Sequence, residues 1–335
     1  MHKPLKINID SASSVPKYRQ LVDAILLKID AGQLQKGDKI PSLNKLCESG
    51  NMSRDTAMMA LNELKTRGVL MSHPGKGYFV LNTQVEVKKR VFVLFDEMNA
   101  FKEDMYQSFI ESLAPKIDVD IYFHHFNRQL FIELIEKAVG NYSHYVIMPA
   151  TFEKISGTLA LLPASRVIVL DRLKPELSQL FSIYQDFEQD VFEAMEKNAV
   201  LFTKYRHFIM AHPGGKEPVE RVKGLERFCA KHRRTLDIID ALEPEMAISG
   251  ACYLLPSDRD LVRLIKVASQ KKWLLGETIG VVSFNDTMLK EVVASGISTI
   301  STDFMMMGKT LSEAINQKLN TSVRNPWRFI NRGSA

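Results

Sequence analysis

The chain has 335 residues, which is enough for two or three domains, each with its own hydrophobic core. An apolar content of 45% and a charged content of 25% are ordinary for a soluble globular protein. No apolar run approaches the length of a transmembrane helix, and the first residues lack the apolar core of a signal peptide, so we expect a cytoplasmic protein.

Charge is unevenly distributed along the chain, and the distribution indicates a class of protein. Residues 1–90 hold 15 Lys and Arg against 8 Asp and Glu, a net charge of +7, whereas the other residues hold 29 against 31, a net charge of −2. This asymmetry favours a nucleic-acid-binding domain joined to a sensor, with chance segregation of surface charge as the alternative.

The cysteines, Cys47, Cys229 and Cys252, are odd in number, widely spaced and set in apolar segments, which indicates buried thiols and no disulfide or metal site.

Residues 16–80 carry the pattern of three short helices and a β wing. A first helix is expected at 16–31, where apolar residues recur at helical spacing before Gly32. Ser42 and Ser53 are good N-caps for two further helices, and a buried stripe is expected on the second of these at Ala57, Ala60, Leu61 and Leu64. Strands at 69–71 and 78–80 flank a tight turn at 74–77. A helix-turn-helix with a wing fits this pattern, and so does a small helical hairpin with a polar surface.

The matching of many spacings at once separates these two alternatives. A recurring signature is carried by Tyr18, Gln20, Leu21, Gly32, Leu34, Gly37, Asp38, Ile40, Pro41, Ser42, Ser53, Arg54, Thr56, Ala60, Leu61, Leu64, Gly68, Gly75, Gly77, Phe79 and Val80. In this set the chain resembles the GntR family of bacterial transcription regulators over about its first 80 residues, which implies DNA binding. The chain departs from the family at Asn44 and Met58, where the family often has arginines that touch DNA, and this leaves the operator sequence open.

The predicted DNA contacts lie at helix N-termini and on the wing. In helix-turn-helix proteins, the first-turn positions of the second helix of the motif face base edges in the major groove, and Arg54, Thr56 and Met58 occupy this region here. Lys76 is expected to contact phosphate or the minor groove. With the positions that the resemblance implies, the predicted DNA-contacting residues are Ser42, Asn44, Ser53, Arg54, Asp55, Thr56, Met58, Gly75, Lys76 and Gly77.

From Val91 onward, short apolar strands alternate with helices. Strands are expected at 91–95, 119–123, 145–148, 167–170, 207–211, 235–239 and 279–284, and helices at 103–114, 128–139, 187–204, 218–232, 259–270 and 304–319. The alternation predicts parallel sheets with both faces covered. Two consecutive sets of elements predict two Rossmann-like lobes, the second ending in helix 304–319, with a ligand cleft at the carboxyl ends of the strands. Met305-Met306-Met307 is expected to be core, and 212–216 a plain turn.

Four stretches in this part resemble motifs of the LacI family in the correct order. They are Ile168-Val169-Leu170-Asp171-Arg172, the segment 220–225, the segment 277–286 and the C-terminal Asn331-Arg332-Gly333-Ser334. The resemblance implies an effector domain similar to periplasmic sugar-binding proteins. A further motif of the family survives only as Asp258 within 256–261, and the family's hinge helix is missing. The combination resembles the arabinose-repressor type of GntR regulator.

Motif position implies the residues that would bind the effector. Asp171, Arg221 and Asp258 are the polar candidates, since carboxylates accept from hydroxyls and a guanidinium donates to two oxygens. Phe101 is the expected stacking residue for the apolar face of a sugar. The alternatives are an ion pair between Asp171 and its neighbour Arg172, a structural role for Arg221, replacement of Asp258 by Asp260, and a core position for Phe101.

The residues and the two resemblances together predict a winged helix-turn-helix (α+β) DNA-binding domain at 1–81, a linker at 82–90 and a two-lobed α/β periplasmic-binding-protein-like domain with parallel sheets at 91–335. We expect a homodimeric transcription regulator with a double-stranded DNA operator and a small sugar effector as partners, and with no cofactor, metal or membrane. An enzyme is not expected, because no nucleophile–base pair is present. The alternatives are a sugar phosphate or nucleobase effector, or a cytoplasmic solute-binding protein.

Overall fold

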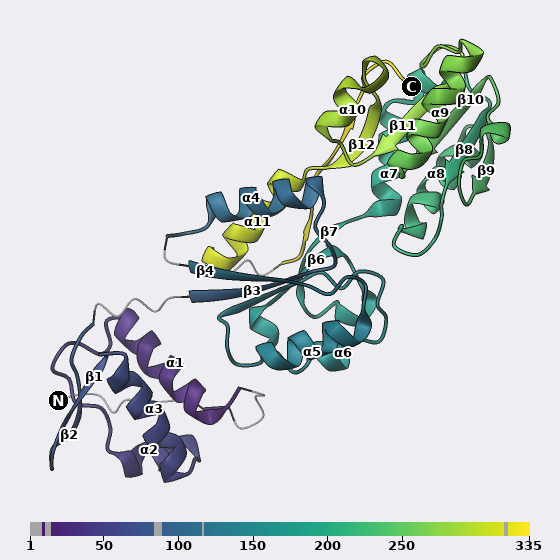
Figure 1. Ribbon diagram of the computed structural model, residues 1–335. Helices are drawn as coiled ribbons and strands as arrows, with labels where there is room; N and C mark the ends of the chain where they lie inside the picture. The colour runs from purple at the N-terminus through teal and green to yellow at the C-terminus, as the bar shows by residue number, and fades with distance from the viewer. Residues whose placement is uncertain (1–8, 11–14, 84–88, 116, 318–320) are drawn as a thin grey trace.

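The computed structural model describes residues 9–10, 15–83, 89–115, 117–317 and 321–335. These residues form three units in a row, an N-terminal domain followed by two α/β lobes (Figure 1). We call the lobe next to the N-terminal domain lobe 1 and the other lobe 2. Within the described residues, no helix combines the length and the apolar character needed to cross a membrane.

The N-terminal domain is a winged helix-turn-helix. It consists of α1 (Lys17–Asp30), α2 (Leu43–Gly50), α3 (Arg54–Thr66) and the antiparallel hairpin of β1 (Leu70–His73) and β2 (Gly77–Val80). The predicted N-caps are confirmed, because the Ser42 hydroxyl accepts from the N–H of Lys45 at 3.4 Å and the Ser53 hydroxyl from that of Thr56 at 3.2 Å. The predicted stripe on α3 is fully buried against α1 and the hairpin.

Lobe 1 is a six-stranded parallel sheet with helices on both faces. Its strand order is β13-β7-β6-β5-β3-β4. Its elements are β3 (Lys89–Phe95), α4 (Ala100–Ser112), β4 (Ile117–Phe123), α5 (Arg128–Ala138), β5 (His144–Ile147), α6 (Ser156–Leu159), β6 (Val167–Arg172), β7 (Phe181–Gln185), α11 (Phe304–Gln317) and β13 (Val323–Arg324), with 3-10 turns at Ala164–Arg166 and Pro175–Leu177. β3 therefore includes the last two residues of the predicted linker, whose residues 84–88 lie outside the described part.

Lobe 2 has a second six-stranded sheet in the order β14-β12-β11-β10-β8-β9, in which only β14 runs antiparallel to its neighbour. Its elements are α7 (Phe187–Lys197), β8 (His207–Ala211), α8 (Val219–Lys231), β9 (Thr235–Ile239), β10 (Ala251–Leu255), α9 (Asp258–Lys271), β11 (Gly280–Phe284), α10 (Met288–Val292), β12 (Ser298–Thr302) and β14 (Trp327–Ile330), with 3-10 turns at Ala199–Phe202, Pro244–Met246 and Val293–Ser295. The expectation of two lobes built from parallel α/β sheets is confirmed.

The assignment of helix 304–319 to the second lobe is wrong. The chain crosses between the lobes three times, and α11 packs beside α4 in lobe 1 (Figure 1). The contact is close, since a Cβ on Gly308 would lie 2.2 Å from the carbonyl oxygen of Met105, and the Ser108 hydroxyl donates to the Met305 carbonyl at 2.8 Å. An amphipathic pattern reveals that a helix has a buried face, but it does not reveal which sheet covers that face.

Other differences have similar causes. β12 reads Ser-Thr-Ile-Ser-Thr, so a search for apolar runs misses it, although all five of its residues are buried. Strands β7, β10 and β14 were also not predicted, and the helix expected at 187–204 ends at Lys197. Met305 and Met306 are 54% and 41% exposed, so only Met307 of the three methionines is core. Cys47 is half-buried, while Cys229 and Cys252 are buried as expected.

Candidate DNA-binding surface and ligand cleft

The first turn of α3 presents a charged, accessible surface. Arg54 and Asp55 are exposed, and the guanidinium of Arg54 has no hydrogen bond or ion pair within the described residues. The Thr56 hydroxyl shares a hydrogen bond of 2.8 Å with the hydroxyl of Ser53. Met58 is half-buried, and its sulfur accepts from the Tyr78 hydroxyl at 3.4 Å, so this predicted contact residue is turned toward the wing.

The remaining predicted DNA contacts lie at the start of α2 and at the tip of the wing. Ser42 and Asn44 are exposed at the start of α2. Gly75, Lys76 and Gly77 are exposed at the tip of the wing, where the φ angles of 72° at Gly75 and 105° at Gly77 favour glycine. Helix N-termini and a basic hairpin tip are both suited to phosphate oxygens.

All four predicted effector residues line one cleft between lobe 1 and lobe 2. The cleft has a volume of about 450 Å³, and Phe101, Asp171, Arg221 and Asp258 are all part of its wall. Phe101 and Asp171 come from lobe 1, at α4 and the end of β6, while Arg221 and Asp258 come from the starts of α8 and α9 in lobe 2. The strand ends thus meet at the cleft, as expected for open α/β sheets.

Arg221 is the most deeply buried of the four residues. Its guanidinium lies over the rings of Phe284 at 4.6 Å and Phe187 at 5.3 Å, and Nη1 donates to Glu217 at 3.0 Å. Burial lowers the pKa of Arg221, although the Glu217 and Asp171 carboxylates oppose that shift. A guanidinium stays protonated in proteins and has five N–H groups, so most donors of Arg221 have no protein partner among the described residues.

Asp171 is held in an unusual backbone conformation. Its φ angle is 78°, which is costly for a residue with a side chain and which often marks a ligand site. Its carboxylate accepts from the Gln185 amide at 2.5 Å, and Gln185 in turn accepts from the Thr302 hydroxyl at 2.5 Å. The described contacts include no ion pair between Asp171 and Arg172. The guanidinium of Arg172 instead donates to the Lys216 carbonyl at 3.1 Å and lies 3.9 Å from the carboxylate of Glu220.

Phe101 and Asp258 have partners inside the protein. The Phe101 ring stacks on Phe304 with 4.7 Å between centroids, so one of its faces is already covered. Asp258 is exposed and pairs with the buried ammonium of Lys290 at 3.2 Å. Asp260, the sequence alternative to Asp258, is buried and accepts from the N–H of Leu242 at 3.3 Å, which is a structural contact.

Several residues of the cleft escaped the sequence reasoning. Asp96 directly follows β3, and Asn285 directly follows β11, so their positions at strand ends could have identified them. Lys102, Lys216 and Lys290 carried no such signal, because a lysine in a loop or helix is usually a surface residue. The segment 212–216, expected to be a plain turn, contributes Pro213, Gly214 and Lys216 to the wall.

Positive and negative charges balance on the cleft wall. The basic residues are Lys102, Arg172, Lys216, Arg221 and Lys290, and the acidic ones are Asp96, Glu97, Asp171, Glu217 and Asp258. Most of the basic residues pair with a carboxylate of the same wall. Among the described residues, no group of three or more His, Cys, Asp or Glu could hold a metal ion.

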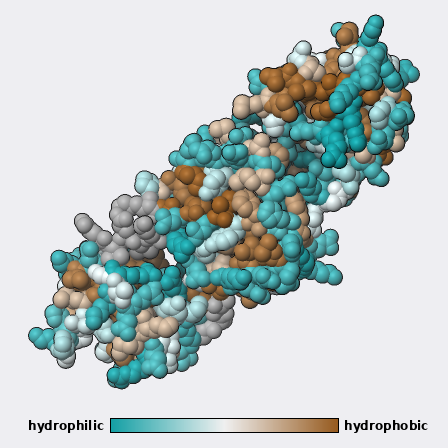
Figure 2. All heavy atoms as spheres, viewed as in Figure 1, coloured by the Kyte–Doolittle hydropathy of each residue, from teal (hydrophilic) through white to brown (hydrophobic). Residues whose placement is uncertain are grey.

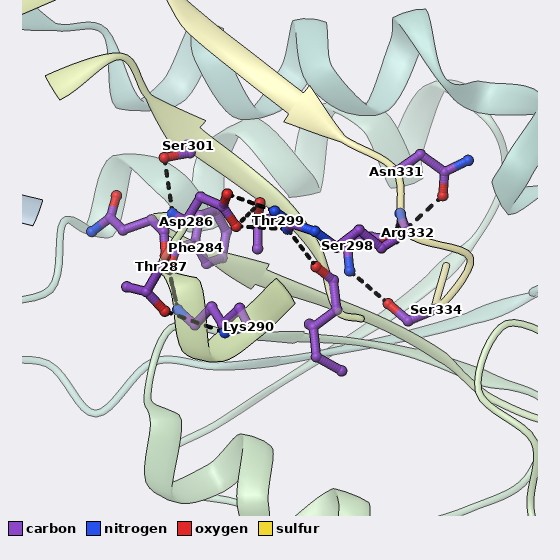
Figure 3. Close-up of polar contacts among 12 residues, drawn as sticks. Phe284, Asp286, Thr287, Lys290, Ser298, Thr299, Ser301, Asn331, Arg332 and Ser334 are labelled. Carbon is purple, nitrogen blue, oxygen red and sulfur yellow. Dashed lines mark hydrogen bonds and ion pairs between the residues drawn. The ribbon is translucent and has the colours of Figure 1, made fainter. Parts of the chain in front are cut away.

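Two of the motif stretches join each other outside the cleft. Arg332 of the C-terminal motif donates to both carboxylate oxygens of Asp286, at 2.7 and 2.8 Å (Figure 3). Burial would raise the pKa of Asp286, but hydrogen bonds from Arg332 and Thr299 hold it below its usual value. The Ser334 hydroxyl accepts from the Ser298 N–H at 2.8 Å (Figure 3). These residues hold the C-terminus on lobe 2.

We expect buried His124 to make the stability of lobe 1 depend on pH. Its Nε2–H donates to the Met148 carbonyl at 3.0 Å, and burial lowers its pKa below the ordinary 6.5. The unfolded chain therefore binds this proton more tightly, so the stability from neutral His124 is present above about pH 6.5 and is lost as the pH falls. In His124→Gln, the amide can keep the bond to Met148 without titrating.

The melting temperature of the full chain at about pH 7.5 and about pH 5.5 measures this effect. We expect the wild type to lose more thermal stability on acidification than His124→Gln does. Comparing the two proteins cancels the contribution of other titrating groups. An equal loss in both would mean that His124 is not the group responsible.

Comparison with known proteins gives a family match for the N-terminal part of the chain. Residues 17–80 match the model of the bacterial regulatory proteins of the gntR family. The chain is 41% identical over 68 residues to the uncharacterized HTH-type transcriptional regulator YdfD of Bacillus subtilis, covering 20% of this chain and 14% of that protein. It is 39% identical over 67 residues to the arabinose metabolism transcriptional repressor of Geobacillus stearothermophilus, covering 20% of this chain and 18% of that protein. The chain thus spans less than a fifth of the length of either relative.

The two lobes are similar to solved structures of another family. A LacI family transcriptional regulator from Silicibacter pomeroyi superposes with a TM-score of 0.61 at 15% identity, covering 73% of this chain and 98% of that chain. At this identity the likeness concerns the fold. The chain therefore joins a helix-turn-helix domain of the GntR type to a two-lobed α/β domain with the fold of the LacI-family regulators.

Proposed function

We propose that this protein is a transcription regulator whose DNA binding responds to a small neutral sugar held between lobe 1 and lobe 2. The observation that carries the proposal is the combination in one chain of a winged helix with an accessible Arg54, whose side chain has no partner among the described residues, and a cleft with buried Arg221 on its wall. The GntR match over residues 17–80 supports the DNA-binding role. The winged helix argues against a solute-binding protein for transport, because transport does not require a DNA-binding domain.

The charge balance of the cleft favours a neutral effector over a sugar phosphate. A phosphate brings about −1.5 to −2 charges at neutral pH and requires uncompensated cations. Lys216 pairs with Glu97 at 2.7 Å, and Lys290 pairs with Asp258 at 3.2 Å, so these lysines already have counter-charges. Hydroxyl groups need both donors and acceptors, and a wall of paired charges supplies both.

Closure of the cleft would change the pose of the DNA-binding domains. The contacts that already cross the cleft include the ion pair of Lys216 with Glu97 and the hydrogen bond from Arg172 to the Lys216 carbonyl. An effector that contacts both lobes would favour the closed arrangement by its differential affinity. Oδ2 of Asp23, on α1, lies 3.8 Å from Nη1 of Arg166 in lobe 1. This contact links the two domains, so a rearrangement of lobe 1 can shift the DNA-binding domain.

A homodimer would supply the two DNA-binding domains that a two-fold operator requires. Exposed apolar side chains on α10, Met288, Leu289 and Val292, form part of the apolar surface of lobe 2 (Figure 2). Apolar surface of this kind is suited to burial against a second copy. Sedimentation equilibrium of the full chain measures the oligomeric state, and a monomer at all concentrations would contradict the dimer.

Lys76→Ala should weaken binding to every DNA sequence by a similar factor. The side chain is exposed at the wing tip, where an ammonium meets the phosphate backbone and reads no base. Each lost phosphate contact lowers the slope of log K against log salt by about 1. Fluorescence anisotropy with operator and random DNA at several salt concentrations measures both quantities. A loss confined to one sequence would assign Lys76 to base recognition instead.

Two measurements test the proposal as a whole. Selection from a random duplex library tests whether the wild-type chain prefers one DNA sequence. Thermal-shift screening with neutral sugars, sugar phosphates and nucleobases tests the effector, because a ligand that binds only the native state raises its melting temperature. Stabilisation by phosphorylated sugars alone would contradict a neutral effector.

A further inference from the structure

A buried ion pair on the lobe 1 side of the cleft has unused hydrogen-bonding groups. Asp96, just after β3, and Lys102, in the first turn of α4, are 7% and 6% exposed and both line the cleft. The Lys102 ammonium donates to Oδ1 of Asp96, which also accepts from the N–H of Glu97 at 2.7 Å. Within the described residues, two ammonium N–H groups and the Asp96 Oδ2 atom have no protein partner.

The other buried lysine of the cleft, Lys290, has a protein partner for each of its three ammonium N–H groups. Lys290, on lobe 2, donates to the carbonyl of Phe284 at 2.7 Å (Figure 3) and to that of Asn285 at 2.9 Å. It also pairs with Asp258 at 3.2 Å. Its three N–H groups are therefore all engaged, and it secures the turn between β11 and α10. Of these two buried lysines, only Lys102 can donate to a ligand without breaking an internal bond.

The surroundings of the pair match one class of ligand. Phe101, adjacent to Lys102, provides an apolar ring at the cleft wall, and its stacking on Phe304 holds that ring in place. A sugar has an apolar C–H face and an edge of hydroxyl groups, so a ring beside a polar pair fits both parts. Arg221 belongs to the opposite lobe, so a ligand that meets both sites contacts lobe 1 and lobe 2 together.

We propose that the Asp96–Lys102 pair binds two adjacent hydroxyl groups of the effector. One hydroxyl oxygen accepts from the Lys102 ammonium, and the neighbouring hydroxyl donates to Oδ2 of Asp96. A vicinal diol matches the pair because each hydroxyl can both donate and accept, and the pair offers one group of each kind. The charges of the pair cancel, so no ionic group is needed on the ligand. This assignment rests on the proposed function and adds the chemical group that lobe 1 recognises.

The test compares the wild type with the double variant Asp96→Asn/Lys102→Met. Removing both charges avoids leaving one buried ion without its partner, which is far more destabilising. Lys231→Met is the control, because Lys231 has an exposed side chain that pairs with one carboxylate, Glu196 at 2.5 Å, and neither residue lines the cleft. The probes are neutral pentoses, hexoses and disaccharides, each with its single-deoxy analogues. Thermal shift finds the binding sugar, and calorimetry then measures the affinities.

We expect the wild type to bind one sugar at least about tenfold more tightly than the analogue that lacks one hydroxyl of a vicinal pair. The double variant should lose this discrimination, whereas Lys231→Met should keep it. A merely structural role would weaken the sugar and its analogues alike. If the double variant does not fold, Asp96→Asn/Lys102→Gln also removes both charges but keeps hydrogen-bonding side chains at the two positions, and a smaller discrimination than in the wild type is expected from it because hydrogen bonds to neutral groups are weaker.

Two outcomes would overturn the assignment in distinguishable ways. If a sugar binds the wild type and the variant discriminates its deoxy analogues equally well, the diol site is wrong while the sugar effector stands. If no neutral sugar stabilises the wild type, the proposed effector itself is wrong, and the diol site fails with it.

Discussion

Arg221→Ala should weaken effector binding by about tenfold or more, which corresponds to about 1.4 kcal/mol. The guanidinium is buried and lies over the rings of Phe187 and Phe284. Among the described side chains, it donates a hydrogen bond to Glu217 alone. Truncation would leave hydroxyl groups of a bound sugar without a donor, in a site that excludes much of the water that could replace it. Calorimetry with the sugar found by thermal-shift screening measures the loss.

The same substitution should leave DNA binding without effector nearly unchanged, because Arg221 lies in lobe 2 and the winged helix is a separate unit. Arg227→Ala is the matched control. It lies on the same helix α8 but forms an exposed ion pair with Glu188 at 2.9 Å, and such pairs contribute little. Intact effector affinity in folded Arg221→Ala would mean that the effector binds elsewhere. Loss of DNA binding as well would assign Arg221 a structural role.

Arg54→Ala should cost about 1–3 kcal/mol of operator binding, or roughly 5- to 150-fold in affinity. The side chain is exposed in the first turn of α3 and has no internal partner within the described residues, so its removal should not disturb the fold. An arginine at this place can donate two hydrogen bonds to a guanine in the major groove, and the loss should therefore be larger for the operator than for random DNA.

The measurement uses the DNA sequence selected by the wild-type chain. Lys65→Ala, an exposed lysine in the last turn of the same helix, serves as the control and should change operator affinity much less. Unchanged operator affinity of folded Arg54→Ala would refute the assignment of α3 as the recognition helix. An equal loss on operator and random DNA would make Arg54 a phosphate contact.

Local patterns determined the elements of the winged helix. Ser42 and Ser53 lie at positions where their hydroxyls can satisfy the free N–H groups of a helix start, and the stripe from Ala57 to Leu64 repeats at helical spacing. Both signals depend only on residues within one or two turns. The alternation of apolar strands and helices after Val91 is local in the same sense, and it predicted parallel sheets with ligands at strand ends.

Tertiary structure decided where distant segments meet. Only packing assigns α11 to lobe 1, since Gly308 permits its close approach to Met105, and no pattern within α11 names that partner. Polar β12 is buried because other strands and helices surround it. Asp171 and Arg221 were identified by motif, whereas Lys102 was not, because its burial arises from its pairing with Asp96 and from its place on the cleft wall. Sequence spacing records which side chains share a face of one element, but the contacts between elements that shape a cleft form only when the chain folds.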